Sequence, residues 1–316
     1  MVMSTPVTLS AQPKPTPSYR GRFAPSPTGP LHLGSLLTAT ASYLDARSNN
    51  GIWLVRMEDL DPPREQAGAA SAILTSLEAH GLYWDESVIY QSQRLSHYHE
   101  LCHQLQQRQL AYPCNCTRQM IKADGEIYSG RCRHQVVDIT QAHSIRLLTS
   151  DLPSGEQQPP MPISYDDIFQ GLQQQNVATE VGDFIIRRRD GLIAYQLAVV
   201  ADDIAQKINH VIRGCDLLDN TPRQLWLYAL LQAAPPAFGH LPILTNAQGQ
   251  KLSKQTFAPA LDDASASANL RRVLTWLNHT PPAELTHAPA TELLNWASAH
   301  WSRQRLPHLQ AIVHTP

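Results

Sequence analysis

Two groups of residues, far apart in this chain, could bind phosphate, and the first is a Pro/Gly-rich loop at 24–30. The loop precedes an expected helix that begins near Gly34. A helix N-terminus presents unpaired backbone N–H groups and a partial positive charge, so this arrangement attracts anions. His32 adds a ring nitrogen that can donate to phosphate. The stretch therefore predicts an anion site, although a surface Pro–Gly turn with an incidental His is the alternative for this stretch alone.

The second group is a pair of lysines. Lys251 and Lys254 flank Ser253 in the segment 251–255, Lys-Leu-Ser-Lys-Gln. Paired lysines on a loop can close over a triphosphate and stabilise charge that develops at the α-phosphorus. Alone, such a segment is more often a solvated surface loop. The presence of both groups in one chain favours chemistry on a nucleotide triphosphate.

Three of the five cysteines lie close together in the sequence, at Cys114, Cys116 and Cys132. Three thiolates in a short irregular segment suit tetrahedral Zn²⁺, which takes a fourth ligand. Chemistry alone nominates His134, because imidazole is a far commoner zinc ligand than phenolate. Free thiols are the alternative. We expect a structural rather than catalytic zinc, and the odd number of cysteines does not indicate a disulfide framework.

Length and composition limit the class of protein. The 316 residues carry a net charge of −2, with 42% hydrophobic and 16% charged residues. A protein that binds nucleic acid through bulk electrostatics is usually more basic, so any RNA contact should be local. No apolar run is long enough for a membrane span. We expect a cytoplasmic protein and a monomer, with a disordered tail at 1–18.

The elements that must position these residues follow an alternating pattern. Strand, helix, strand and helix are expected in turn at 19–23, 34–47, 51–56 and 67–80, which indicates a doubly wound parallel sheet of the α/β class. Later strands are expected at 183–187, 193–200 and 210–213, and a helix at 222–231. The predicted domains are the first half of a Rossmann-type catalytic domain (19–94), an inserted zinc subdomain (95–183), the second half (184–245), and the lysine loop with a small helical domain (246–316).

The motifs between Arg20 and Gln255 resemble those of glutamyl-tRNA synthetases, which are class I aminoacyl-tRNA synthetases. The resemblance is strongest to the short branch of that family, the glutamyl-Q tRNA(Asp) synthetases. The matching stretches are Arg22-Phe-Ala-Pro-Ser-Pro-Thr-Gly29, His32-Leu-Gly-Ser35, Arg56-Met-Glu-Asp59, Asp183-Phe-Ile-Ile-Arg-Arg-Arg-Asp-Gly191, Tyr195-Gln196, His210-Val-Ile-Arg-Gly214 and Lys251-Leu-Ser-Lys254. Ser35 stands where the first signature usually has a second His, and Gln255 stands where Ser is usual.

The resemblance implies roles for particular residues. His32, Lys251 and Lys254 would be catalytic, and ATP, bound with Mg²⁺, would contact Pro25, His32, Gly34, Ser35 and Lys254. Arg22 and Arg213 would face the carboxylates of glutamate, and Glu58 its ammonium group. The full set implied for glutamate is Arg22, Phe23, Ala24, Pro25, Ser26, Glu58, Tyr195 and Arg213. The resemblance also favours Tyr128 over His134 as the fourth zinc ligand, beside Cys114, Cys116 and Cys132.

The resemblance further implies a two-step reaction. Glutamate and ATP would form glutamyl-adenylate, and the glutamyl group would pass to queuosine in the anticodon loop of tRNA(Asp). The stretch after Lys254 is too short for the anticodon-reading region of a full glutamyl-tRNA synthetase, which favours this acceptor. The alternatives are a minimal glutamyl-tRNA synthetase that charges a tRNA 3′ end, and a non-catalytic RNA-binding paralogue.

Overall fold

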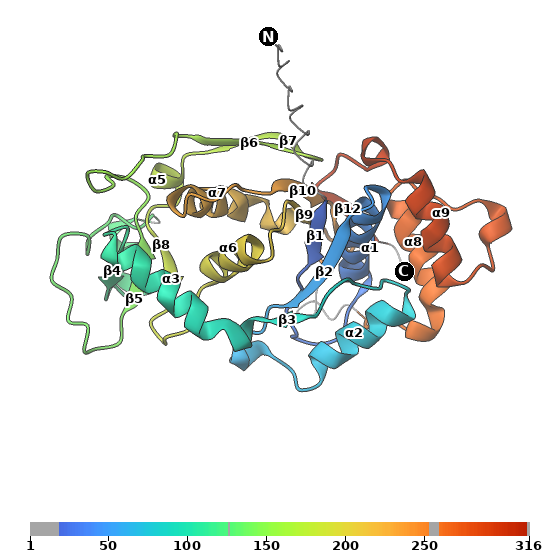
Figure 1. The fold of residues 1–316 in the computed structure, drawn as a ribbon, viewed down its shortest axis with the longest axis horizontal. Helices are drawn as coiled ribbons and strands as arrows, with labels where there is room; N and C mark the ends of the chain where they lie inside the picture. The colour runs from blue at the N-terminus through green and yellow to red at the C-terminus, as the bar shows by residue number, and fades with distance from the viewer. Residues whose placement is uncertain (1–18, 126, 253–258, 315–316) are drawn as a thin grey trace, which may run out of the picture.

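The centre of the molecule is a five-stranded sheet in which every neighbouring pair is parallel (Figure 1). The computed structural model describes residues 19–125, 127–252 and 259–314. In the order β10-β9-β1-β2-β3, the strands are β10 (Ala237–Leu241), β9 (His210–Gly214), β1 (Arg20–Phe23), β2 (Ile52–Met57) and β3 (Ile89–Tyr90). The predicted parallel α/β sheet is confirmed.

The strand order reverses beside β1, which pairs with β2 on one side and with β9 on the other. Such a reversal leaves a crevice at the carboxyl ends of the strands, where open α/β sheets bind ligands. The helices of the two halves are α1 (Leu33–Ser48), α2 (Ala69–Ala79), α6 (Tyr195–Ala205) and α7 (Thr221–Leu230). The predicted helices at 34–47, 67–80 and 222–231 are thus present.

One predicted strand is wrong. The stretch 193–200 was expected to be a strand, but Tyr195 begins helix α6. Every residue from Gln196 to Asp203 is buried in that helix. A helix that is buried on all sides shows no amphipathic period, and its apolar run cannot be distinguished from a buried strand by pattern alone. Tyr195 therefore lies in the first turn of a helix rather than on a strand.

Most of the polypeptide between β3 and α6 lies on the left of Figure 1, beside the main sheet, and the hairpin at 163–175 runs back along the top of the figure towards β10. A three-stranded antiparallel sheet joins β4, β5 and β8, and a hairpin joins β6 to β7. The elements are α3 (Leu95–Gln107), β4 (Ala111–Cys114), α4 (Arg118–Asp124), β5 (Ser144–Leu147), β6 (Ile163–Asp167), β7 (Gly171–Gln175), α5 (Val177–Glu180) and β8 (Phe184–Arg187). The expected strand at 183–187 is therefore present as β8.

The C-terminal helices α8 (Ala266–Trp276) and α9 (Ala290–His300) pack on the first half of the molecule, at the right of Figure 1. Leu270, Leu274 and Leu293 belong to the same buried cluster as Leu36 and Leu37 of α1. The region expected to be helical also supplies a strand, since β12 (Ala311–Val313) pairs in parallel with β11 (Ile243–Thr245). The division into domains stays a prediction.

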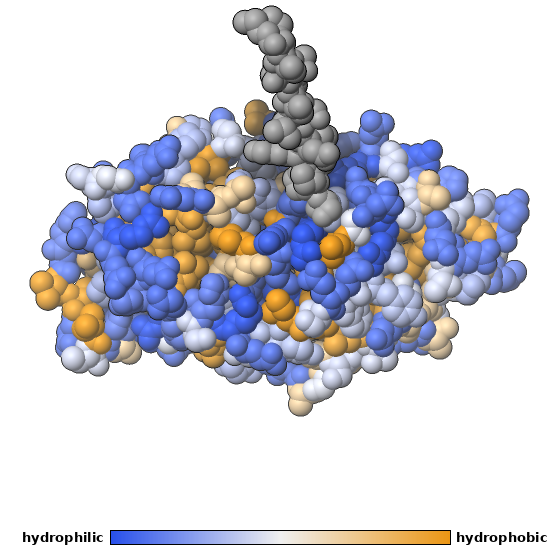
Figure 2. All heavy atoms as spheres, viewed as in Figure 1, coloured by the Kyte–Doolittle hydropathy of each residue, from blue (hydrophilic) through white to orange (hydrophobic). Residues whose placement is uncertain are grey.

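Short 3₁₀ helices connect these elements, at η1 (Pro62–Arg64), η2 (Gln91–Arg94), η3 (Cys215–Asn220), η5 (Asp263–Ser265), η6 (Ala283–Leu285) and η7 (Arg303–Arg305). Figure 2 shows hydrophilic residues over most of one face, with hydrophobic residues gathered mainly over the region of α6 and α7. Within the described stretches, no helix has both the length and the apolar character required to cross a bilayer.

Candidate active site

A cavity of about 580 Å³ lies at the carboxyl ends of β1, β2 and β9. The structure brings together around this one cavity all of the described residues that the sequence nominated for ATP and glutamate. They are Arg22, Phe23, Ala24, Pro25, Ser26, His32, Gly34, Ser35, Glu58, Tyr195, Arg213 and Lys251. Lys254 lies outside the described residues.

The N-terminus of α1 forms one side of the cavity. His32 caps this helix, and its Nδ1 accepts a hydrogen bond from the backbone N–H of Ser35 at 3.3 Å. Because Nδ1 is an acceptor there, the ring proton is on Nε2, which lies 3.2 Å from the Ser35 hydroxyl. A Cβ at Gly34 would meet the His32 ring at 3.1 Å, so glycine allows the ring to approach the helix. Ser35 thus orients the histidine beside the anion-attracting end of α1.

Lys251 reaches this side of the cavity from the loop after β11. The backbone N–H of the next residue, Leu252, donates to the carbonyl of Leu244 at 2.7 Å, which fixes the start of the loop. The Lys251 ammonium group lies 2.5 Å from Oδ2 of Asp216, which lines the same cavity. Their side chains are 42% and 34% exposed, so water screens this ion pair.

Arg213, on β9, extends its guanidinium group from the floor of the cavity. Its hydrogen bonds go to Nε2 of His240 at 2.9 Å, the Tyr195 hydroxyl at 3.3 Å, the Thr221 hydroxyl at 2.8 Å and the Leu217 carbonyl at 3.4 Å. All four acceptors are uncharged when His240 is neutral. Among the described residues, no carboxylate forms an ion pair with Arg213, although the residue is only 4% exposed. A buried cation of this kind requires an anion, which the cavity leaves room for.

Arg22 is the second arginine nominated for a carboxylate, and its surroundings are different. Its Nε and Nη2 donate to the two oxygens of Asp203 at 3.1 and 3.2 Å, both side chains being buried. Burial raises the pKa of Asp203, but the charges of Arg22 and Arg56 outweigh it and hold that pKa below its usual value. Arg22 is therefore neutralised within the protein, and of its nitrogens only Nη1 takes no part in this pair. Arg213 is the stronger candidate for a substrate carboxylate.

Glu58 is one of two carboxylates that line the described part of the cavity, beside Asp216. Its carboxylate lies 3.4 Å from Nη2 of Arg56, a fully buried side chain that also pairs with Asp203 at 2.8 Å. Burial raises the pKa of Glu58, and the charges of Arg56 and Arg22 oppose that rise. A substrate ammonium group beside Glu58 would favour its ionised form in the same way.

Sequence reasoning missed Asp167 and His240, which stand behind Arg213. Asp167 ends β6, and its Oδ2 lies 2.5 Å from Nδ1 of His240 on β10. Both side chains are fully buried. Neither residue is part of a motif used to nominate the site, and only the return of the β6–β7 hairpin to the main sheet brings them together. The Ile168 N–H donates to the Phe238 carbonyl at 2.8 Å at this junction.

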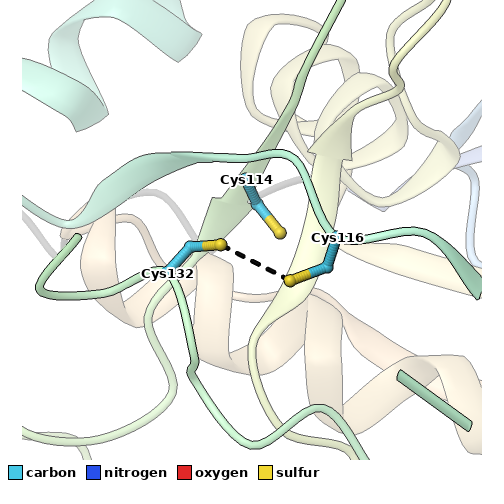
Figure 3. Close-up of side chains that lie close together, drawn as sticks. All are labelled: Cys114, Cys116 and Cys132. Carbon is cyan, nitrogen blue, oxygen red and sulfur yellow. Dashed lines mark hydrogen bonds between the residues drawn. The ribbon is translucent and has the colours of Figure 1, made fainter. Parts of the chain in front are cut away.

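The cysteine cluster lies apart from the cavity, where β4 ends. The sulfurs of Cys114, Cys116 and Cys132 are all within 4.8 Å of one another, and Figure 3 shows their side chains converging. The Tyr128 hydroxyl lies 3.4 Å from the Cys114 sulfur and accepts the Cys132 N–H at 3.0 Å. His134 is exposed and contributes no ligand atom to the group. Three sulfurs and one phenol oxygen form a donor set that fits zinc.

The surroundings of the cluster favour negative charge on one of its ligands, Cys114. The Arg146 guanidinium carbon lies 3.8 Å from the centre of the Tyr128 ring, and Nε of Arg146 donates to the Cys114 sulfur at 3.3 Å. Burial raises the pKa of Cys114, but its hydrogen bonds with Tyr128 and Arg146 hold that pKa below its usual value. Burial raises the pKa of Cys116 to about 11. A bound cation would stabilise the thiolate forms of both.

Comparison with known proteins identifies the class of this fold. Residues 18–272 match the family model described as tRNA synthetases class I (E and Q), catalytic domain. A glutamate tRNA ligase from Elizabethkingia meningosepticum, solved in complex with its amino acid, superposes with a TM-score of 0.74 and is 25% identical. That alignment covers 93% of this chain and 66% of the other, so the present chain spans about two thirds of the ligase. The fold is that of a class I tRNA synthetase.

Two curated relatives define the branch more closely. The glutamyl-Q tRNA(Asp) synthetase of Thiobacillus denitrificans is 52% identical, over 91% of this chain and 94% of the relative. The protein of the same name from Neisseria meningitidis serogroup C is 51% identical, over 92% and 97%. The chain therefore belongs to the glutamyl-Q tRNA(Asp) synthetase family of ligases, and the resemblance found in its motifs is confirmed at that level.

Proposed function

We propose that this ligase activates glutamate with ATP and transfers the glutamyl group to queuosine in the anticodon loop of tRNA(Asp). The observation that carries the first step is Arg213, a buried cation with uncharged partners in a cavity whose other side is a helix N-terminus. One side of the cavity suits a carboxylate and the other suits phosphate. The names of the relatives support the acceptor.

In this proposal the cavity positions two reactants for an in-line displacement. The side-chain carboxylate of glutamate would lie against Arg213 and its ammonium group against Glu58. The triphosphate of ATP would lie at the N-terminus of α1, with His32 and Lys251 as donors, and with Lys254, which is outside the described residues, as a further donor. Mg²⁺ enters with ATP and neutralises part of the triphosphate charge. The residues contribute chiefly by positioning and by electrostatic stabilisation.

The bond changes in the two steps are simple. An oxygen of the glutamate α-carboxylate attacks the α-phosphorus, a new P–O bond forms, and pyrophosphate leaves. A nucleophile on the modified base then attacks the carbonyl carbon of glutamyl-adenylate and loses its proton to water. The bond from that carbon to the phosphate oxygen breaks, and AMP leaves. Lys251 must exchange Asp216 for phosphate before the first step.

We further propose that Cys114, Cys116, Tyr128 and Cys132 hold a structural zinc ion. The convergence of the three sulfurs and the phenol oxygen supports this ligand set over one that includes His134. The zinc would stiffen the turn between β4 and Cys132, which has a hydrophobic cluster of only a few residues. The chemistry at the nucleotide needs no metal from this site.

The test of the acceptor is ATP-dependent transfer of radiolabelled glutamate to purified tRNA(Asp), with and without queuosine, and to tRNA(Glu). We expect label only on tRNA(Asp) that carries queuosine. Label at the 3′ end of tRNA(Glu) would instead establish a minimal glutamyl-tRNA synthetase. The absence of any glutamate-dependent pyrophosphate exchange would indicate a non-catalytic paralogue and refute the proposal.

A further inference from the structure

The orientation of Arg213 depends on the protonation state of His240. Nε of Arg213 lies 2.9 Å from Nε2 of His240, and a guanidinium group can only donate hydrogen bonds. Nε2 must therefore present its lone pair, and the single proton of the neutral ring is on Nδ1. That proton points at Oδ2 of Asp167, 2.5 Å away. The tautomer of His240 follows from its two partners.

Asp167 is itself locked in one orientation. Its Oδ1 accepts the backbone N–H groups of Phe169, Gln170 and His240, each at 3.0 Å. Its Oδ2 is left for the imidazole. Three backbone donors therefore hold one oxygen of the carboxylate, and the other oxygen faces the ring as an acceptor.

We propose that Asp167 and His240 are positioning residues that fix Arg213 for binding the glutamate carboxylate, and that protonation of His240 weakens this binding. The inference rests on the proposed activation of glutamate. A proton on Nε2 would replace the acceptor of Arg213 with a donor and place a second cation beside the guanidinium group. Arg213 would then lose the contact that fixes Nε and would turn from its place in the cavity.

The surroundings of His240, taken together, favour the neutral ring. Asp167 on β6 and Asp216 on η3 favour the charged form, while burial and Arg213 on β9 oppose it. The Thr221 hydroxyl lies 3.2 Å from Nε2, and the Cys215 thiol donates to the backbone carbonyl of His240. Burial is the largest influence and the pKa of His240 falls below 6.5. The ring is therefore neutral at pH 7. Protonation of His240, and the weaker glutamate binding that it causes, begin only as the pH falls below 6.5.

The decisive variant is Asp167→Asn, which keeps the shape of the side chain. The three backbone N–H groups retain the amide oxygen, so the amide NH₂ faces Nδ1 of His240. The NH₂ donates to Nδ1 and forces the ring proton onto Nε2, opposite the Arg213 donor. We expect the KM for glutamate in pyrophosphate exchange to rise roughly 10- to 100-fold, the loss of one hydrogen bond to a charged group. The KM for ATP should not change.

Nitrogen NMR of the His240 ring reads the tautomer independently of any substrate. We expect the proton on Nδ1 in the wild type and on Nε2 in Asp167→Asn. A proton on Nε2 in the wild type overturns the proposal whatever the activity. A folded Asp167→Asn enzyme with the wild-type KM for glutamate overturns it as well. If the wild type neither binds nor exchanges glutamate, the proposed function fails, and the ring spectra still decide the tautomer.

Two further variants separate positioning from general stability. Asp45→Asn also removes a buried carboxylate, at the far end of α1, and should leave the KM for glutamate unchanged. His240→Gln keeps an acceptor for Arg213 but cannot be protonated. Its KM for glutamate should rise less steeply than that of the wild type as the pH falls below 6.5, because only Glu58, whose pKa is raised by burial, still titrates at this contact. An equally steep rise in KM for His240→Gln and for the wild type would assign the titration to another group and refute that part of the proposal.

Discussion

At the scale of single residues, the cavity contains two buried arginines that differ in whether a carboxylate is paired with them. Arg22 is neutralised by a bidentate pair with Asp203, and Arg213 has only uncharged acceptors. Removal of Arg22 leaves the buried Asp203 with Arg56 as its remaining ion-pair partner among the described residues, whereas removal of Arg213 takes a counter-ion from no described carboxylate. The two arginines should therefore contribute differently to stability and to binding.

Substitution of each arginine by alanine tests this difference. Arg213→Ala should reduce glutamate-dependent pyrophosphate exchange by about 100-fold or more, since a buried charged contact to a ligand is worth about 3 kcal/mol. Its thermal unfolding should stay near that of the wild type. Arg22→Ala should lower the unfolding temperature, because Asp203 loses its bidentate partner. Near-normal exchange by Arg213→Ala would refute its assignment to the carboxylate.

The pH dependence of stability is a second prediction at this scale. Burial holds the folded-state pKa of His240 below its ordinary value of 6.5. The folded protein therefore binds fewer protons than the unfolded chain just below pH 6.5, and stability is lost as the pH falls through that range. Denaturant unfolding of the wild type and of His240→Gln should converge as the pH is lowered from 7 to 5. A constant difference between them would contradict the shift.

The sequence predicts the residues of the cavity but not the residues behind it. Arg22, His32 and Lys251 lie in motifs whose spacing and chemistry could be interpreted directly. Asp167 and His240 lie 73 positions apart and meet only in the tertiary structure. A polar residue at the end of a hairpin and a histidine on a buried strand carry no local signal of a shared function.

At the scale of elements, the helix α6 shows why the position of Tyr195 could not be predicted. The alternating strands and helices of the first half have clear turn signals, and the sequence predicts them correctly. The buried run that follows Ala194 includes a continuous apolar stretch from Leu197 to Ala201, and so short a stretch fits a strand as well as a helix. The helix places the Tyr195 hydroxyl 3.3 Å from Arg213 at its first turn.

The cluster of Cys114, Cys116, Tyr128 and Cys132 predicts how substitutions should change the zinc content of the protein. Cys116→Ser should lose zinc as measured by elemental mass spectrometry, and Tyr128→Phe should bind zinc more weakly, because each removes one of four donors. Cys102→Ser is the matched control, since Cys102 is buried on α3 outside the cluster. His134→Ala should retain zinc. Zinc-free but fully folded wild-type protein would rule the site out.

At the scale of the whole molecule, the C-terminal helices complete the core of the first half. Buried residues of α8 and α9 pack with those of α1 in one cluster. Asp45 of α1 is fully buried and accepts hydrogen bonds from the Tyr19 hydroxyl, the Trp301 indole, and Nε and Nη2 of Arg303. The segment after α9 is therefore fastened to the middle of the molecule by a buried carboxylate.

The ion pair between Arg303 and Asp45 predicts the effect of Arg303→Ala on stability. The substitution leaves the Asp45 charge buried without an ion-pair partner and should lower the free energy of unfolding by about 2 kcal/mol. That is less than for a fully buried pair, because the Arg303 side chain is 35% exposed. Denaturant unfolding measures the loss, and Arg271→Ala, on the neighbouring helix α8, is a control that removes an arginine without breaking a buried ion pair. Equal losses would contradict the role of Asp45.

The ion pair between Lys251 and Asp216 predicts how the proposed binding of ATP should respond to salt. In the proposed reaction, incoming triphosphate must displace Asp216 from the Lys251 ammonium group, because the two side chains already form an ion pair. Dissolved ions screen the attraction between lysine and phosphate, and they equally screen the attraction between lysine and Asp216. The two effects oppose each other, so the affinity for ATP should decline less steeply with ionic strength than a count of cationic contacts implies. Asp216, beside Lys251, should therefore make the affinity for ATP less sensitive to changes in salt concentration.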